Sequence, residues 1–163
     1  MFRKMRRVRQ LLDTDFAKDA LNRGSSGVLS VHGDDGYPYG VPLSYVYHDG
    51  KLYFHTATSG HKLDAIKNND KVSFTVILQD NLVAEKFTSY FMSVIAFGRA
   101  RVIEDEEEKR KTISILSDRY FPEMKEESYD EINSTFDRFH MIEMTIEHIT
   151  GKQAIELVND GNQ

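Results

Sequence analysis

The sequence predicts a mainly β protein with helices, in which about six antiparallel strands close into a small barrel. From residue 27 onward the apolar residues alternate with a period of two, the pattern of half-buried strands. The Asp-Gly pairs in "DDG" (34–36) and "HDG" (48–50) separate alternating runs, and this is the strongest short-range hairpin signal. A meander of this size has to close or to pack on another layer, and closure removes exposed edges.

The first residues predict a basic arm and one helix. Residues 1–12 contain Arg3, Lys4, Arg6, Arg7 and Arg9. We expect a solvated terminal segment; binding of nucleic acid or of an anionic ligand is the alternative. Next, Asp13 or Thr14 caps a short helix that Gly24 ends.

The middle of the chain alternates between strands and one helix. Three strand-like runs occupy residues 27–56, and residues 59–69 predict a helix with Leu63 and Ile66 facing inward. Further strands follow at 71–78 and 90–103. In the second of these, Gly98 predicts a β-bulge or a close approach of another backbone.

Residues 104–138 predict a helical insertion before the last strand. Acidic residues precede basic ones in "EDEEEKRKTISILSDRYF", an order that suits a solvated helix face, and Pro122 ends this helix. Residues 129–139 predict another helical turn or two, and 140–150 alternate as a closing strand. Without a linker or repeat, we expect one domain across residues 1–163.

Composition excludes several classes of function. The chain has no cysteine, which excludes disulfides, thiolate catalysis and iron–sulfur clusters and is compatible with a reducing cytoplasm, the expected location. No pair of its histidines has the i, i+4 spacing of a helical zinc site, so no metal is expected. A net charge of −5 argues against nucleic acid as the main partner. The apolar runs are too short to span a membrane, and the start lacks the features of a secretory signal.

The stretch "HTATSGHK" (55–62) joins a predicted strand to a predicted helix and concentrates groups that can bind an anion. A helix N-terminus offers unpaired N–H groups and the positive end of a dipole. Ser59 can cap the helix, Gly60 permits close approach of the backbone, and His61 and Lys62 add donors. These features suit a phosphate monoester; a plain helix cap beside a surface lysine is the alternative reading.

Four segments in order carry a resemblance to a known family. "YPYGVPLSYVYHDGKLYFHTATSGHKLDAIKNNDKVSFTV" (37–76), which spans two of these segments, is followed by "SVIAFGRARVIED" (93–105) and "ITGKQAIEL" (149–157). The pattern resembles the pyridoxamine 5'-phosphate oxidase-related flavoproteins, and within them the nitroimidazole-resistance branch. The resemblance implies a split β-barrel of about six antiparallel strands. It also implies a homodimer that binds FMN at its interface.

The resemblance also implies which residues contact FMN. His61 and Lys62 would form the phosphate clamp, with His61 in the position of the family's arginine, and Ser59 belongs to the same predicted cofactor-binding turn. Residues of one strand would line the isoalloxazine, mainly through backbone groups: Val41, Pro42, Leu43 and Ser44. The flavin and its ribityl chain would lie beside His55 and Thr56. The partner subunit would contribute Ser93 and Val94, and Lys152 would approach the cofactor.

Two departures from the family pattern limit the function. Histidine lacks the bidentate fork of arginine, so the grip of His61 on a phosphate should be weaker. The chain contains no tryptophan, and no late Trp-plus-Arg pair is present, so oxidation of pyridoxamine phosphate itself is not expected.

The resemblance therefore implies an FMN-dependent oxidoreductase, with nitroreduction as the candidate activity. The substrate would be small, planar and electron-poor, and NAD(P)H would bind only transiently because no Rossmann fingerprint is present. His55 is either a satisfied core residue or a proton donor. The alternative is a non-catalytic flavin- or haem-binding protein, in which His55 or His61 could ligate haem.

Overall fold

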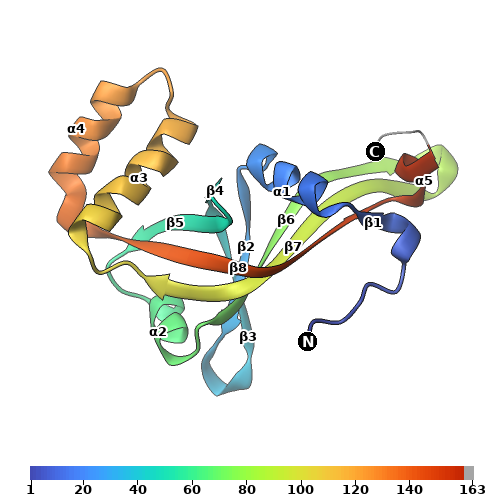
Figure 1. Cartoon of the computed structure of the whole chain (residues 1–163), viewed down its shortest axis with the longest axis horizontal. Helices are drawn as coiled ribbons and strands as arrows, with labels where there is room; N and C mark the ends of the chain where they lie inside the picture. The colour runs from blue at the N-terminus through green and yellow to red at the C-terminus, as the bar shows by residue number, and fades with distance from the viewer. Residues whose placement is uncertain (160–163) are drawn as a thin grey trace.

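The computed structural model describes residues 1–159, and within that range eight strands form one antiparallel sheet (Figure 1). The strand order is β3-β2-β6-β7-β8-β5-β4, with β1 paired to β8. The strands are β1 (Leu11–Leu12), β2 (Ser26–His32), β3 (Pro38–Ser44), β4 (Val46–His48), β5 (Lys51–Ala57), β6 (Lys71–Val83), β7 (Thr88–Val102) and β8 (Phe139–Gln153). The predicted fold class is confirmed, but the expected number of strands is wrong because the very short β1 and β4 were not predicted.

Five α-helices accompany the sheet in the described part of the chain: α1 (Thr14–Arg23), α2 (His61–Asn68), α3 (Glu106–Tyr120), α4 (Lys125–Thr135) and α5 (Ile155–Asn159). The predicted cap of α1 is confirmed, since the Asp13 carboxylate accepts from the N–H groups of Asp15 (2.8 Å) and Phe16 (3.2 Å). The α3–α4 hairpin covers one end of β5 and β8 (Figure 1). Helix α4 is longer than predicted, and none of the described helices is long and apolar enough to cross a bilayer.

One residue, Tyr45, carries the chain from one edge of the sheet to the other. It separates β3 from β4, which end the strand order on opposite sides and share no hydrogen-bond ladder. The sheet therefore curls, but no hydrogen-bond ladder joins its edge strands β3 and β4, so the expected closure of the barrel is not found. The single expected strand breaks here because Tyr45 turns into the interior, where it is 1 % exposed.

The corner at Tyr45 is held by the C-terminal end of α3. The Tyr120 hydroxyl accepts from the Tyr45 N–H (3.1 Å) and lies within donating distance of the carbonyl oxygens of Tyr45 (2.8 Å) and Ser25. The Tyr45 hydroxyl donates to the Leu21 carbonyl at 2.7 Å. Burial is the main cause that raises the pKa of the Tyr45 phenol above its ordinary value.

Alternation along β5 separates two apolar clusters. Leu52 and Phe54 point into the barrel core, whereas Tyr53 joins a second cluster that includes Ile113 and Leu116 of α3. His55 follows Tyr53 at a spacing of two, so it lies on the side of the sheet covered by the helical hairpin. Thr56 lies on the opposite, core-facing side and is buried.

The predicted irregularity at Gly98 is confirmed. The β7–β8 register shifts between Phe97 and Gly98, and a Cβ at Gly98 would overlap the carbonyl oxygen of Thr145. Glycine is needed because the neighbouring backbone occupies the space of a side chain.

Charged side chains are buried at the junction of the sheet and α3. Glu143 accepts from Lys51 (2.9 Å) and Arg101 (3.1 Å). Burial acts to raise the pKa of Glu143, but these hydrogen bonds hold it below its ordinary value. Lys109 is also buried, and its Nζ donates to the Phe136 carbonyl at 2.6 Å. The expectation that the basic residues of this helix lie on a solvated face is therefore wrong at Lys109.

We predict that Tyr120→Phe lowers the free energy of unfolding by about 1 to 2 kcal/mol, because backbone groups at the corner lose their partner. The matched control is Tyr129→Phe on α4, whose hydroxyl donates to the accessible Asp118 carboxylate at 2.9 Å; it should change stability by less than about 0.5 kcal/mol. Urea denaturation of both variants measures the difference, and equal losses would contradict the role of Tyr120.

Glu143→Gln should cost about 2 kcal/mol at neutral pH, because two cationic partners lose a buried carboxylate. The folded pKa of Glu143 lies below its ordinary 4.5, so this contribution is complete above pH 4.5 and is lost as the pH falls through the folded value. The difference between wild type and variant should shrink accordingly. Glu147→Gln removes a more exposed ion pair to Arg99 and serves as the control; a pH-independent cost for Glu143→Gln would refute the explanation.

Candidate functional site

The turn between β5 and α2 has backbone donors that no side chain satisfies. Helix α2 begins at His61, and its N-cap residue is Gly60 with a φ of 136°. No side chain caps this helix, so the expected cap by Ser59 is wrong. The reason is that the glycine, not the serine, occupies the cap position, and open space surrounds the place where its Cβ would stand. The first turn therefore keeps free N–H groups and the positive dipole end.

Two side chains next to this turn also have unused hydrogen-bonding capacity. Lys62 is half-buried and makes no ion pair among the described residues. Thr56 is 5 % exposed, and its Oγ1 is buried without a hydrogen-bond partner. Buried polar atoms are nearly always paired in folded proteins, so the Thr56 hydroxyl has an open hydrogen-bonding position, as do the side chains of Gln10 and Gln153 elsewhere in the described residues.

His61 connects α2 to the β2–β3 hairpin. Its ring stacks on Tyr39 with centroids 4.3 Å apart and planes inclined by 12°. Its Nε2 accepts from the Asp34 N–H at 3.3 Å, so only Nδ1 remains available to an anion. With one ring nitrogen available, His61 cannot make the bidentate contact that an arginine makes with a phosphate. Instead it holds the turn against β3, a contact that the sequence alone did not predict.

The four residues expected to line a flavin ring lie on an edge strand. Strand β3 pairs with β2 on one side only, so the peptide groups on its other side have no ladder partner. Pro42 and Ser44 are exposed, whereas Val41 and Leu43 are half-buried on the inward side. Because Tyr39 lies on the same strand and touches His61, this free edge begins beside the α2 turn.

The remaining predicted residues lie in another part of the sheet. Ser93 pairs with Lys152 across β7 and β8. Val94 is only 1 % exposed and packs in the core of its own chain, so its side chain does not line an interface site; alternation along β7 turns it inward. Thr56 pairs with His140, and Lys152 lies twelve positions further along β8, roughly 40 Å in an extended strand. Within one chain, Ser93 and Lys152 therefore lie far from Thr56 and the α2 turn.

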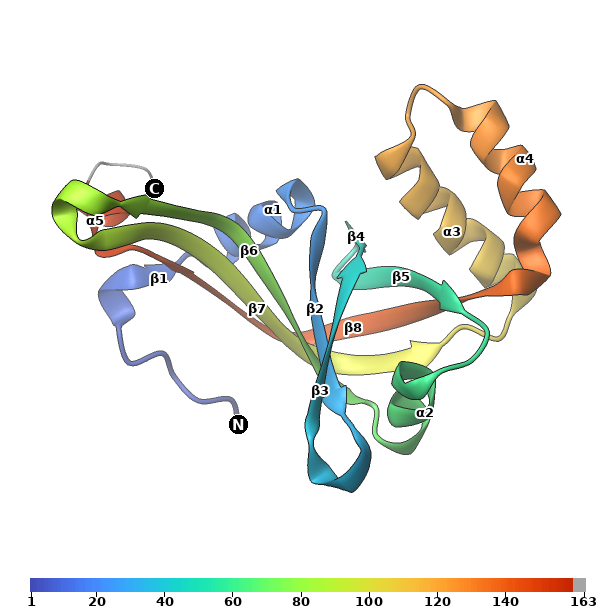
Figure 2. The ribbon, with the colours of Figure 1, turned by 180° about the vertical axis from the view of Figure 1, so that it is seen from behind.

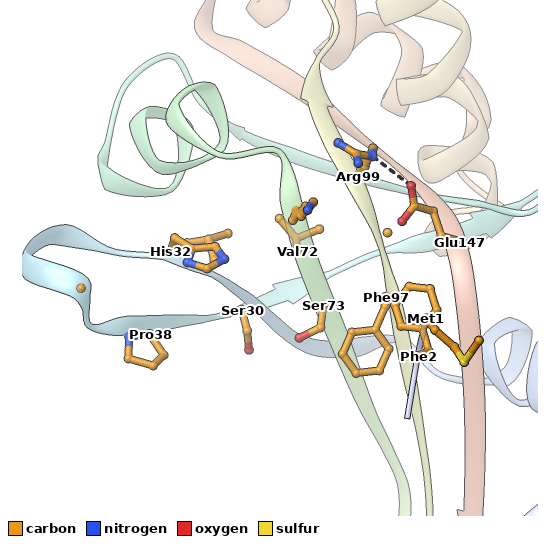
Figure 3. Close-up of a pocket in the computed structure, with 14 residues that line it drawn as sticks. Met1, Phe2, Ser30, His32, Pro38, Val72, Ser73, Phe97, Arg99 and Glu147 are labelled. Atoms are coloured by element: carbon orange, nitrogen blue, oxygen red, sulfur yellow. Dashed lines mark hydrogen bonds and ion pairs between the residues drawn. The ribbon is translucent and has the colours of Figure 1, made fainter. Parts of the chain in front are cut away.

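A hollow of about 720 Å³ lies elsewhere (Figure 3). It lies on the outer face of β2, β6 and β7 beside the start of the chain, and none of the predicted site residues lines it. Its arginine, Arg99, is paired with Asp70 and Glu147, both at 2.9 Å, so its charge is already balanced. Phe2 stacks on His148 with centroids 4.6 Å apart, so the tip of the basic arm packs on the sheet. Arg99 is therefore not available to a phosphate, although Lys71 also lines this hollow.

His55 opens into a second hollow of about 480 Å³ beneath the α3–α4 hairpin. The other walls come from residues that sequence reasoning did not single out, among them Phe121, Met124 and Ile132. Their apolar character in an insertion expected to be solvated is the signal that could have identified them. In the described part of the chain, no three His, Asp or Glu side chains are grouped so as to hold a metal ion.

Comparison with known proteins identifies the family of the chain. A family model described as pyridoxamine 5'-phosphate oxidase matches residues 13–153, so the chain belongs to that family. No curated protein matches significantly.

Solved structures share the fold. A proposed 5-nitroimidazole antibiotic resistance protein from Bacteroides thetaiotaomicron is 21% identical with a TM-score of 0.72, covering 88% of this chain and 86% of that one. A flavocytochrome from Azotobacter vinelandii is 20% identical with a TM-score of 0.78, covering 93% and 72%. An FAD-binding protein from Mesorhizobium loti is 25% identical with a TM-score of 0.65, covering 89% and 97%.

Proposed function

We propose that the protein is an FMN-dependent oxidoreductase whose cofactor phosphate binds at the N-terminus of α2. The observation that carries the proposal is the set of unsatisfied donors at this turn: the free N–H groups after Gly60, unpaired Lys62 and the orphan hydroxyl of Thr56. A dianion supplies the acceptors that these donors lack. Membership of the pyridoxamine 5'-phosphate oxidase family and the flavin-binding structural neighbours support it.

The residues present fit this cofactor along its length. Lys62 supplies a full positive charge for the phosphate, and Thr56 a hydroxyl near the ribityl chain. The free edge of β3 offers peptide N–H and C=O groups to the polar edge of a flat ring. His61 holds that edge beside the turn through Tyr39 and Asp34. Bound FMN would supply two-electron transfer, while the chain supplies position and electrostatics.

The proposed substrate is a small, planar, electron-poor compound such as a nitroaromatic, with NAD(P)H as a transient donor. His55 is exposed at the end of β5, and its imidazole can hold a proton for delivery to a substrate atom. The structural likeness to a proposed nitroimidazole resistance protein supports this class of substrate.

A homodimer would complete the site. Ladder register places Ser93 and Lys152 on the outer face of the sheet, together with Val28, Ile95 and Phe97. These three apolar side chains are 36 to 39 % exposed. Figure 2 shows β6, β7 and β8 extending well beyond the barrel. A twofold mate seated on this outer face would bury the apolar residues and bring its own Ser93 and Lys152 toward a site that they do not reach within one chain.

Haem binding is the competing function, because two of the structural neighbours are a flavocytochrome and an FAD and haem binding protein. His55 and Met124 line the same hollow and could ligate iron. The hollow's lining contains Glu127 and Glu131 but no Lys or Arg to pair with the propionates, so we favour flavin. The absorbance spectrum of the protein distinguishes haem binding from flavin binding, because haem gives a Soret band.

Lys62→Gln should weaken FMN binding by about tenfold or more, because a charge-assisted hydrogen bond to phosphate is lost. Lys67→Gln, in the last turn of the same helix, is the matched control and should leave the affinity unchanged. Quenching of FMN fluorescence during titration measures both. Failure of the wild type to bind FMN, or equal affinities of the two variants, would overturn the proposed phosphate site.

Phe97→Glu should convert the dimer to monomers and weaken FMN binding with it, because a charge would be buried in the apolar contact. Lys111→Glu on α3 places a glutamate away from this face and should sediment like the wild type. Sedimentation velocity with and without FMN tests the idea, and a monomeric wild type that binds FMN tightly would disprove the shared site.

A further inference from the structure

The α3–α4 hairpin lies over one end of β5 and β8 (Figure 1). A hollow, the hairpin groove, is lined by residues of both helices and of these two strands. Its volume of about 480 Å³ falls in the range of sites for small molecules. The lining of the groove includes His55, Phe121, Met124, Glu127, Glu131 and Ile132.

The groove exposes large apolar side chains where the helices turn. Phe121 is 52 % exposed and Met124 is 54 % exposed, although both border an apolar hollow. Ile132 from α4 and Phe139 from β8 extend the apolar lining inward. Contiguous exposed apolar surface around a concavity is characteristic of binding sites, and methionine adapts to flat ligands of varied shape.

The charges of the groove select among ligands. Glu127 and Glu131 lie one helical turn apart on α4 and line it, whereas no Lys or Arg does. The nearby Lys125 is paired with Asp118 at 3.3 Å. The buried ammonium of Lys109 packs on the ring of Phe139, 4.5 Å from its centroid, but Lys109 does not line the groove. The carboxylates that do line it disfavour phosphates, carboxylates and sulfonates and favour neutral or cationic ligands. FMN and nucleotides are poor occupants for this reason.

We infer that the hairpin groove binds the substrate of the proposed flavin reaction, and that this substrate is a small aromatic molecule of neutral or positive charge. Its ring packs between Phe121, Met124 and Ile132, and a polar substituent reaches His55. His55 is the one residue that belongs both to the groove and to the set expected beside the flavin. The α3–α4 insertion then determines which substrates bind. The inference rests on the proposed function, because the ligand is taken to be the substrate of the flavin reaction.

Two fluorescent probes with the same ring system, one of which carries an added sulfonate, test the groove directly. Neutral N-phenylnaphthylamine should bind at least about tenfold more tightly than anilinonaphthalene sulfonate, its anionic counterpart. Glu127→Gln combined with Glu131→Gln should reduce this preference. Met124→Gln should weaken binding of the neutral probe several-fold. The control is Leu82→Gln, at an apolar residue 85 % exposed on the β6–β7 hairpin, which should leave binding of the neutral probe unchanged. Equal binding of the two probes, or no effect of Met124→Gln, would overturn the inference.

The link to catalysis is tested on the FMN-loaded protein with nitrobenzylamine and nitrobenzoate, a cationic and an anionic substrate of similar size. Met124→Gln should raise KM for nitrobenzylamine about tenfold while kcat and FMN affinity stay unchanged, and nitrobenzoate should be the poorer substrate throughout. Tight FMN binding with an unchanged KM would refute the substrate groove and leave the flavin site standing. Absent FMN binding would refute the proposed function, whereas probe binding that depends on Met124 would still support a ligand site.

Discussion

The passage of the chain through Tyr45 from one edge of the sheet to the other is the constraint on which the rest of the structure depends. Strands β3 and β4 are consecutive in sequence but lie at opposite ends of the strand order. The sheet must therefore curl into a barrel, and because no ladder closes it, β3 keeps a free edge. Tyr120 fixes this geometry from α3 by bonding the backbone of the corner. The helical insertion thus stabilises the barrel and also forms the hairpin groove.

The proposed site follows from what lies beside that free edge. His61 stacks on Tyr39 and accepts from the Asp34 N–H, so the uncapped start of α2 is held against β3. Donors for a phosphate and a backbone edge for a flat ring thereby become neighbours although they are distant in sequence. Ser93 and Lys152 lie far along the β7–β8 ribbon, so a second copy is needed to bring such residues to the site.

Features with local causes could be predicted from the sequence. The two Asp-Gly turns have positive φ at Asp35, Gly36, Asp49 and Gly50, and the cap at Asp13 and the bulge at Gly98 also follow from a few adjacent residues. Features that depend on distant partners could not be predicted: the break at Tyr45, the contact of His61 with the β2–β3 hairpin and the burial of Lys109. The inward orientation of Val94, by contrast, could have been predicted, because alternation along β7 implies it. The groove was missed because its walls come from two helices and two strands that meet only in the fold.

The most direct test of the central claim is the crystal structure of the protein reconstituted with FMN. The account predicts a phosphate bonded to the first-turn N–H groups of α2 and to Lys62, with the flavin ring along the free edge of β3 and a second subunit against its other face. A phosphate found elsewhere, such as in the hollow beside Phe2 and Arg99, or a flavin enclosed by one chain alone, would contradict it.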